Sequence, residues 1–102
     1  MSRVLLYKGI YLVGDELKYV LNNLKQQLSE QQDLITKMPY QLFIDKLHNI
    51  DLKPTALNDT DMNDVLSAMN IEFSCEYKLI YGMTSISLYD FEAFIDKAIS
   101  EI

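Results

Sequence analysis

The chain has 102 residues, of which 49% are hydrophobic and 24% are charged, and its formal net charge is −6. This length predicts a single domain with one hydrophobic core, and the composition argues against a disordered chain. No apolar run reaches the roughly 18 residues that a membrane-spanning helix needs. Cys75 is the only cysteine, which excludes an internal disulfide and a thiolate metal site built from this chain alone. We expect a cytoplasmic protein and predict no cofactor.

The negative charge is concentrated in the second half of the chain. Residues 1–56 hold six acidic and seven basic residues, whereas residues 57–102 hold nine acidic residues and only Lys78 and Lys97 as bases. A surface of this sign repels the phosphate backbone of nucleic acids and attracts basic surfaces. We therefore expect a protein partner with a basic surface, and no direct binding of nucleic acid or membranes. The alternative is that the acidic surface only keeps the protein in solution.

The N-terminal segment predicts a strand followed by a helix. Residues 3–13 are apolar on both faces, which is typical of a strand buried on both sides and bent near Gly9. Gly14 ends this strand, and Asp15 is a suitable N-cap for the next element. The apolar residues that follow recur at intervals of three and four, so we predict an amphipathic helix over 15–28. These residues are Leu17, Val20, Leu21, Leu24 and Leu28.

Two helices are predicted in the middle of the chain. The apolar residues of 40–50 have helical spacing, and Pro39 fits the first turn of this helix because that turn needs no amide hydrogen from it. Pro54 then breaks the pattern, since the residue before a proline is pushed out of the helical region. A second helix over 59–69 begins with Asn58 as its N-cap.

Residues 71–82, IEFSCEYKLIYG, alternate apolar and polar side chains with a period of two. This is the period of a strand with one buried face, and it would bury the thiol of Cys75. The short segment GMT turns the chain into SIS, which predicts a hairpin over 71–87. Ser87 and Asp90 then form the capping box of the last helix. We therefore predict an α+β fold, a helix-rich small domain with about four helices packed on a small antiparallel sheet, which consists of the N-terminal strand and this hairpin.

Side chains suited to catalysis are sparse. His48 is the only histidine, and a lone histidine on a helix is more often structural than catalytic. Cys75 on the buried face, with Glu72 and Glu76 nearby, lacks the electropositive setting that a reactive thiolate requires. We therefore predict that the protein is not an enzyme.

The acidic stretch NDTDMNDVLSAMN is the best candidate for a metal site. Asp59, Asp61 and Asn63 have the spacing of the first ligands in a calcium-binding loop. However, Asp64 stands where such a loop needs glycine, and Asn70 stands where it needs a bidentate glutamate. We therefore interpret these carboxylates as a helix first turn, where the helix dipole stabilises them, and predict no metal site.

Three stretches, KLHNIDLKPT, DMNDVLSAM and ISLYDFEAFIDKAI, together resemble an EF-hand lobe of the calmodulin or myosin-light-chain type. They look like its exit helix, its linker and its second helix pair. On this alignment DLITKMPYQLF ends the first loop, Ile35 and Ile86 are the paired central residues, and Asp90 takes the place of the last ligand. The resemblance covers residues 15–102. It implies a calcium-independent lobe that binds a basic amphipathic helix.

The sequence favours a small acidic non-enzymatic domain that binds another protein. Such a domain acts by occupying a basic surface of its partner, and by analogy with phage and bacterial anti-defence and immunity proteins we expect an inhibitor of a nucleic-acid-handling protein. The EF-hand-like lobe is the alternative, and a homodimer stays open as well. The predicted partner-binding residues are Asp59, Asp61, Asp64, Glu72 and Glu76.

Overall fold

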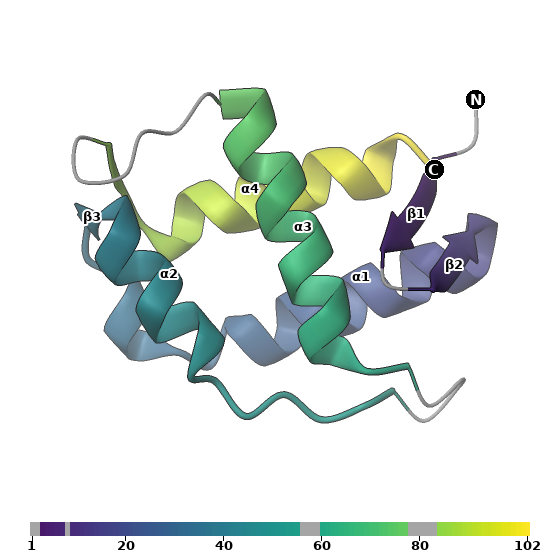
Figure 1. Cartoon of the computed structure of the whole chain (residues 1–102), viewed down its shortest axis with the longest axis horizontal. Helices are drawn as coiled ribbons and strands as arrows, with labels where there is room; N and C mark the ends of the chain where they lie inside the picture. Colours follow the sequence, from purple (N-terminus) through teal and green to yellow (C-terminus); the bar gives the residue numbers. More distant parts are fainter. Residues whose placement is uncertain (1–2, 8, 56–59, 78–83) are drawn as a thin grey trace.

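The computed structural model describes residues 3–7, 9–55, 60–77 and 84–102, and it begins with a hairpin (Figure 1). Strand β1 (Val4–Tyr7) pairs antiparallel with β2 (Ile10–Val13). Gly9 lies in the turn with φ of 84°, a value that residues with a side chain rarely adopt. The prediction of one bent strand over 3–13 is therefore wrong, because the chain reverses its direction at this turn.

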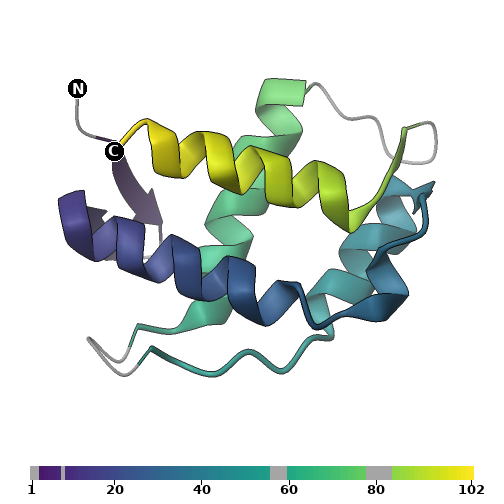
Figure 2. The same ribbon diagram turned by 180° about the vertical axis from the view of Figure 1, so that it is seen from behind.

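Four helices follow in the described part of the chain. They are α1 (Gly14–Leu28), α2 (Tyr40–His48), α3 (Met62–Tyr77) and α4 (Leu88–Ser100). A single 3-10 turn, η1 (Gln32–Leu34), comes after α1. Helices α1 and α4 lie side by side and run in opposite directions, and α3 crosses both of them on one side (Figures 1 and 2). The α+β fold class is thus confirmed.

Two short strands join the segments that precede α2 and α4. Strand β3 (Met38–Pro39) pairs antiparallel with β4 (Ser85–Ile86), and Met38 lies opposite Ile86. The described strands therefore form two separate two-stranded sheets. The predicted sheet, which combined the N-terminal strand with a later hairpin, is wrong in this respect.

Helix α3 includes most of the segment that the alternating pattern assigned to a strand. It continues to Tyr77, so the predicted hairpin over 71–87 is wrong; residues 78–83 lie outside the described residues. The sequence also carries a helical stripe, and burial follows that stripe. Its buried members are Met62, Val65, Leu66, Met69 and Phe73. Ile71 and Tyr77 are each 48% exposed, and Cys75 is exposed and not buried as the strand would have placed it.

An aromatic cluster holds α3 against α4. The ring of Phe73, which is 2% exposed, lies 5.1 Å from Phe91 and 5.3 Å from Phe94, measured between ring centroids. Tyr77, one turn further along α3, lies 5.1 Å from Phe73 and 6.0 Å from Phe94. Tilted and edge-on aromatic pairs of this kind contribute about 0.5–1.5 kcal/mol each beyond the area they bury. The cluster therefore determines which side of α3 faces the core.

A buried hydrogen bond joins α3 to α2. The hydroxyl of Tyr40, a fully buried side chain, donates to Oδ1 of Asn70 at 3.1 Å. The backbone N–H of Tyr40 donates to the carbonyl oxygen of Thr84 at 2.7 Å, which extends the short β3–β4 pairing. Both bonds satisfy polar groups that would be costly to bury unpaired.

The structure confirms one of the predicted helix N-caps and corrects another. At α4 the predicted capping box is confirmed, because the N–H of Ser87 donates to Oδ2 of Asp90 at 2.8 Å. At α1 the N-cap is Val13, so the assignment of this role to Asp15 is wrong; Asp15 lies in the first turn. The reason is that the helix already begins at Gly14, directly after β2.

Helix α3 begins later than predicted. The carboxylate of Asp61 accepts a hydrogen bond from the N–H of Asn63 at 2.9 Å, and its carbonyl oxygen accepts one from Val65 at 3.3 Å. Asp61 therefore caps the helix. Asn58, which the sequence favoured as the cap, lies outside the described residues.

The helices are arranged as two helix–loop–helix units, α1 with α2 and α3 with α4, joined by the β3–β4 pair. The EF-hand resemblance predicts Ile35 and Ile86 as the paired central residues. The central pair differs, because Ile86 lies opposite Met38 and not opposite Ile35. The carboxylate of Asp90, at the place of a last ligand, is used by the capping box.

Replacing Phe73 with alanine distinguishes the helix from the strand. The truncation leaves a cavity in the aromatic cluster and should lower the free energy of unfolding by about 3–5 kcal/mol. The matched variant Ile71→Ala, at a half-exposed position two residues earlier, should change it by less than about 0.5 kcal/mol. Urea denaturation measures both values. A strand would place both side chains on one face, so equal losses would contradict the helix.

The ion pair between Lys97 on α4 and Glu76 on α3 predicts a local pH dependence. The hydrogen bond to Glu76 and the attraction of its carboxylate raise the pKa of Lys97 above 10.5. While both groups are ionised, this exposed pair stabilises the folded protein weakly, and its contribution is lost as the pH rises through the raised pKa of Lys97. In the variant Glu76→Gln, an NMR titration should give Lys97 a lower pKa than in the wild type. An unchanged value would show that the pair does not form in solution.

Candidate protein-binding surface

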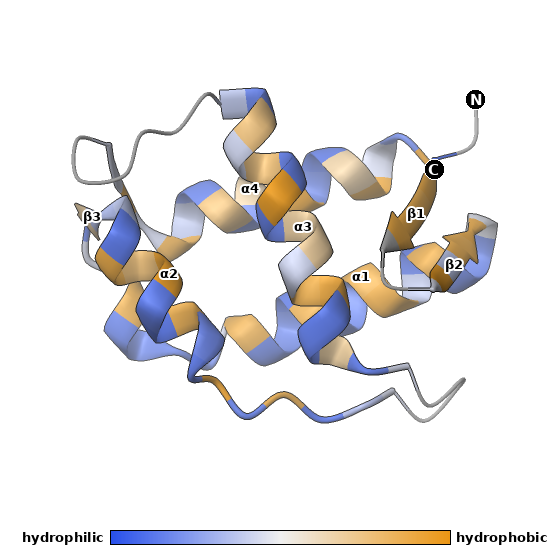
Figure 3. Ribbon diagram, viewed as in Figure 1, coloured by the Kyte–Doolittle hydropathy of each residue, from blue (hydrophilic) through white to orange (hydrophobic). Residues whose placement is uncertain are grey.

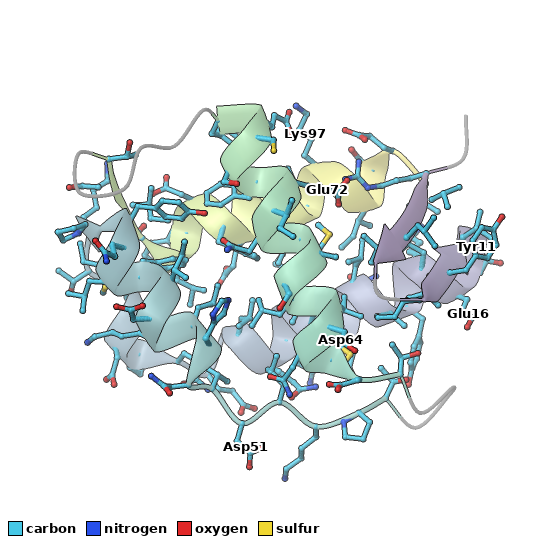
Figure 4. The ribbon with its side chains drawn as sticks, in the orientation of Figure 1. Tyr11, Glu16, Asp51, Asp64, Glu72 and Lys97 are labelled. Atoms are coloured by element: carbon cyan, nitrogen blue, oxygen red, sulfur yellow. The ribbon has the colours of Figure 1, made fainter. Side chains whose placement is uncertain are left out.

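The predicted acidic residues lie at two separate places on α3. Asp61 is exposed just before the helix and Asp64 is half-buried in its first turn, whereas Glu72 and Glu76 lie in its second half (Figure 4). Glu72 follows Asp64 by eight positions, which corresponds to roughly 12 Å along a helix. Asp59 lies outside the described residues. The structure therefore brings together neighbouring pairs of these carboxylates but does not join the pairs into one patch.

Glu72 belongs to a charge cluster that ties both ends of the chain to α3. The guanidinium of Arg3, just before β1, donates to Oε1 of Glu72 and to Oε2 of Glu101, both at 2.6 Å. The side chain of Arg3 is only 16% exposed. One cation thus serves two carboxylates, and the cluster keeps one net negative charge. No local sequence pattern indicates it, because Arg3 and Glu101 are 98 residues apart.

One oxygen atom of Glu72 has no partner. Its Oε2 is buried and makes no hydrogen bond with the described residues, and the same holds for Nε of Arg3. A buried carboxylate oxygen without a donor is costly, since it has lost its hydration. The Glu72 side chain as a whole is 37% exposed. The accessible part of this carboxylate therefore lines the space between α3 and β1, while Oε2 itself is shielded from solvent.

The outer face of the hairpin is apolar and exposed. Its residues form two directly opposed pairs, Val4 with Val13 and Leu6 with Tyr11. Leu6 is 70% and Tyr11 66% exposed, while Leu5 and Leu12 on the other face are buried in the core. Figure 3 shows both strands coloured as hydrophobic. An antiparallel sheet commonly turns a polar face outward, so an outer face of this kind is typical of a contact surface.

A groove of about 250 Å³ continues this face between β1 and α3. Its lining residues are Val4, Leu5 and Leu6 of β1 and Ala68, Ile71 and Glu72 of α3. β1 lies between β2 and α3 in Figure 1, and it contacts both of them. The groove is thus apolar along most of its length and has the Glu72 carboxylate on its wall.

A larger hollow, of about 360 Å³, lies between the end of α1 and residues 50–54. Its wall includes Gln27 of α1, whose side chain is hydrogen-bonded to the segment 50–54. The side-chain N–H of Gln27 donates to the carbonyl oxygen of Lys53, and its Oε1 accepts the N–H of Lys53, both at 2.9 Å. This side chain therefore holds the extended segment in place.

The side chains considered for chemistry are placed as follows. His48 is exposed at the end of α2, and Cys75 is exposed on α3. Among the described residues, no three His, Cys, Asp or Glu side chains gather closely enough to hold a metal ion. Within the same residues, every helix is too short or too polar to cross a membrane.

Known proteins give no further guide to the function. No protein-family model matches the chain, and neither a curated protein nor a solved structure matches it significantly. Three surfaces of the described residues have features of a binding site. They are the groove between β1 and α3, the outer face of the hairpin and the acidic pair at the start of α3.

Proposed function

We propose that this chain is a non-enzymatic protein-binding domain that acts by occupying a basic surface of a partner protein. The observation that carries the proposal is the exposed apolar face of the hairpin, which continues into the groove beside Glu72. Large contiguous apolar patches on a folded domain mark sites of protein contact. Binding through such a patch needs no catalytic group.

The charge of the chain supports a basic partner. With a formal charge of −6, the domain attracts cationic surfaces over distances of several ångströms and repels acidic ones. The clefts in which proteins hold nucleic acids are among the most basic protein surfaces. A domain that fills such a cleft competes with the nucleic acid. We therefore propose an inhibitor of a nucleic-acid-handling protein, of the anti-defence or immunity type.

Among the described residues, no cation forms an ion pair with Asp61 or Asp64, whereas Glu72 and Glu76 are ion-paired. Within this proposal the pair at the start of α3 supplies charges for the rim of the contact. Rim charges of this kind increase the rate of association more than they increase affinity.

The EF-hand-like lobe is a second candidate, and the two helix–loop–helix units joined by β3 and β4 favour it. A lobe of this type grips a basic amphipathic helix between its helices. That would require the core side chains of α3 and α4 to separate, since Phe73, Phe91 and Phe94 are all at most 2% exposed. The two candidates thus differ in whether the partner contacts the surface or the opened core.

Affinity capture with the full chain, followed by cross-linking and identification of the partner, tests the proposal. The purified partner should be basic, and the complex should weaken steeply as the salt concentration rises, because salt screens exposed charges. The chain should also displace nucleic acid from it. An acidic or neutral partner, or a complex that leaves nucleic-acid binding unchanged, would contradict the proposal.

A matched pair of variants tests the rim. The double variant Asp61→Asn and Asp64→Asn keeps a capping side chain and removes two charges; Asp33→Asn and Asp45→Asn removes two exposed charges elsewhere. Both change the formal charge from −6 by two units. The first should slow association with the purified partner about threefold more than the second. Equal rates would assign the effect to net charge alone.

A further inference from the structure

One edge of the hairpin carries backbone groups without a partner strand. Two residues separate Tyr7 from Ile10, so these two form the hydrogen-bonded pair next to the turn, and bonded pairs alternate from there. Leu5 is therefore bonded to β2, whereas Val4 and Leu6 direct their N–H and C=O groups away from it. In the part of the chain that the structure describes, the backbone of neither residue makes a hydrogen bond outside the hairpin. This is the arrangement that an added strand extends.

The unpaired edge faces the groove. Because β1 lies between β2 and α3, the groups that point away from β2 point toward α3. The opposite wall contributes Ala68, whose small side chain leaves room, and Ile71, which is 48% exposed. A strand in this position would form main-chain hydrogen bonds with β1 and bury its alternate side chains against this apolar wall.

Carboxylates border the groove. Glu72 lies on its wall with one buried oxygen unpaired, and Glu101 is joined to the same arginine. Arg3 neutralises only one of the two carboxylates that it binds. The border therefore favours a cationic occupant.

We propose that an extended, basic segment of the partner protein adds to β1 as a third strand in the groove between β1 and α3. Its apolar side chains pack on Ile71 and Ala68, and a lysine or arginine of the segment pairs with the carboxylate of Glu72. This inference rests on the proposed function and names the site and the kind of partner. A second copy of the chain fits less well, because residues 4–7 carry no basic side chain and two copies of charge −6 repel each other.

A synthetic peptide of about seven residues that alternates valine and lysine is long enough to run along β1, and it serves as the probe. Titrated into the full chain, it should bind with a Kd below about 1 mM, measured by fluorescence anisotropy. A peptide that alternates valine and glutamate should not bind, since the border is acidic. Absence of binding by the lysine peptide would overturn the proposal.

Two proline variants identify the edge that is used. Leu6→Pro removes an N–H that points into the groove, and Tyr11→Pro removes the corresponding N–H on the β2 edge; neither removes a hydrogen bond of the hairpin. Leu6→Pro should weaken binding about tenfold, the effect of losing one hydrogen bond, and Tyr11→Pro less than twofold. Equal effects of both variants would overturn the proposal.

A second comparison does not depend on how proline is tolerated. Glu72→Gln and Glu76→Gln each remove one ion-paired carboxylate from α3, but only Glu72 lines the groove. Glu72→Gln should weaken binding about tenfold and Glu76→Gln less than twofold. Light scattering on the free chain measures whether a second copy of the chain occupies the groove. A dimer that dissociates in the Leu6→Pro variant would overturn the proposal. The peptide and variant experiments can fail while salt still releases the captured partner. In that case the proposed function stands, and the binding site at β1 is rejected.

Discussion

The burial of Phe73 sets the rotation of α3, and most of the structure depends on it. Successive residues of a helix are turned by about 100°, so once Phe73 points into the cluster with Phe91 and Phe94, its neighbours cannot. Ile71 and Glu72 are therefore directed away from the aromatic cluster and toward β1. One aromatic contact thus determines both the packing of α3 on α4 and the outer wall of the groove.

The hairpin depends on the same placement. Leu5 and Leu12 are buried on the inner face, and the alternation of a strand then directs Val4, Leu6, Tyr11 and Val13 outward. Arg3 fastens the start of β1 to Glu72 and Glu101, so the hairpin is joined to α3 and to the end of α4. The hairpin edge and the helix wall are held at a defined distance, and a groove remains between them.

Part of this arrangement was predictable from the sequence, because it depends on local patterns. The stripe from Leu17 to Leu28 defines α1, and Ser87 with Asp90 defines the start of α4. The segment after Met69 could not be assigned in this way. Ile71, Phe73, Cys75 and Tyr77 occupy alternate positions and so satisfy the strand period, while Phe73 and Tyr77 also continue the helical stripe. Packing against α4 decides between the two periods, and no local pattern contains that information.

In the candidate site, too, local features could be predicted from the sequence and contacts between distant residues could not. Glu72 was predicted to bind a partner on the grounds of charge alone, and it lies on the wall of the groove, although on a helix and not on a strand; its role stays a prediction. Its arginine partner and the unpaired edge of β1 arise from contacts between distant parts of the chain. The apolar N-terminal segment was interpreted as buried on both faces, because a sequence cannot show that one of two apolar faces is left uncovered.

Within the residues that the structure describes, the edge of β1 toward α3 has no partner strand. Amide hydrogen exchange of the free chain, followed residue by residue by NMR, tests this arrangement most directly. We expect slow exchange for the amide of Leu5, which is bonded to β2, and exchange at least tenfold faster for the amides of Val4 and Leu6, which lack that bond. Exchange at Leu6 as slow as at Leu5 would show that this edge is already occupied and is not open to an added strand.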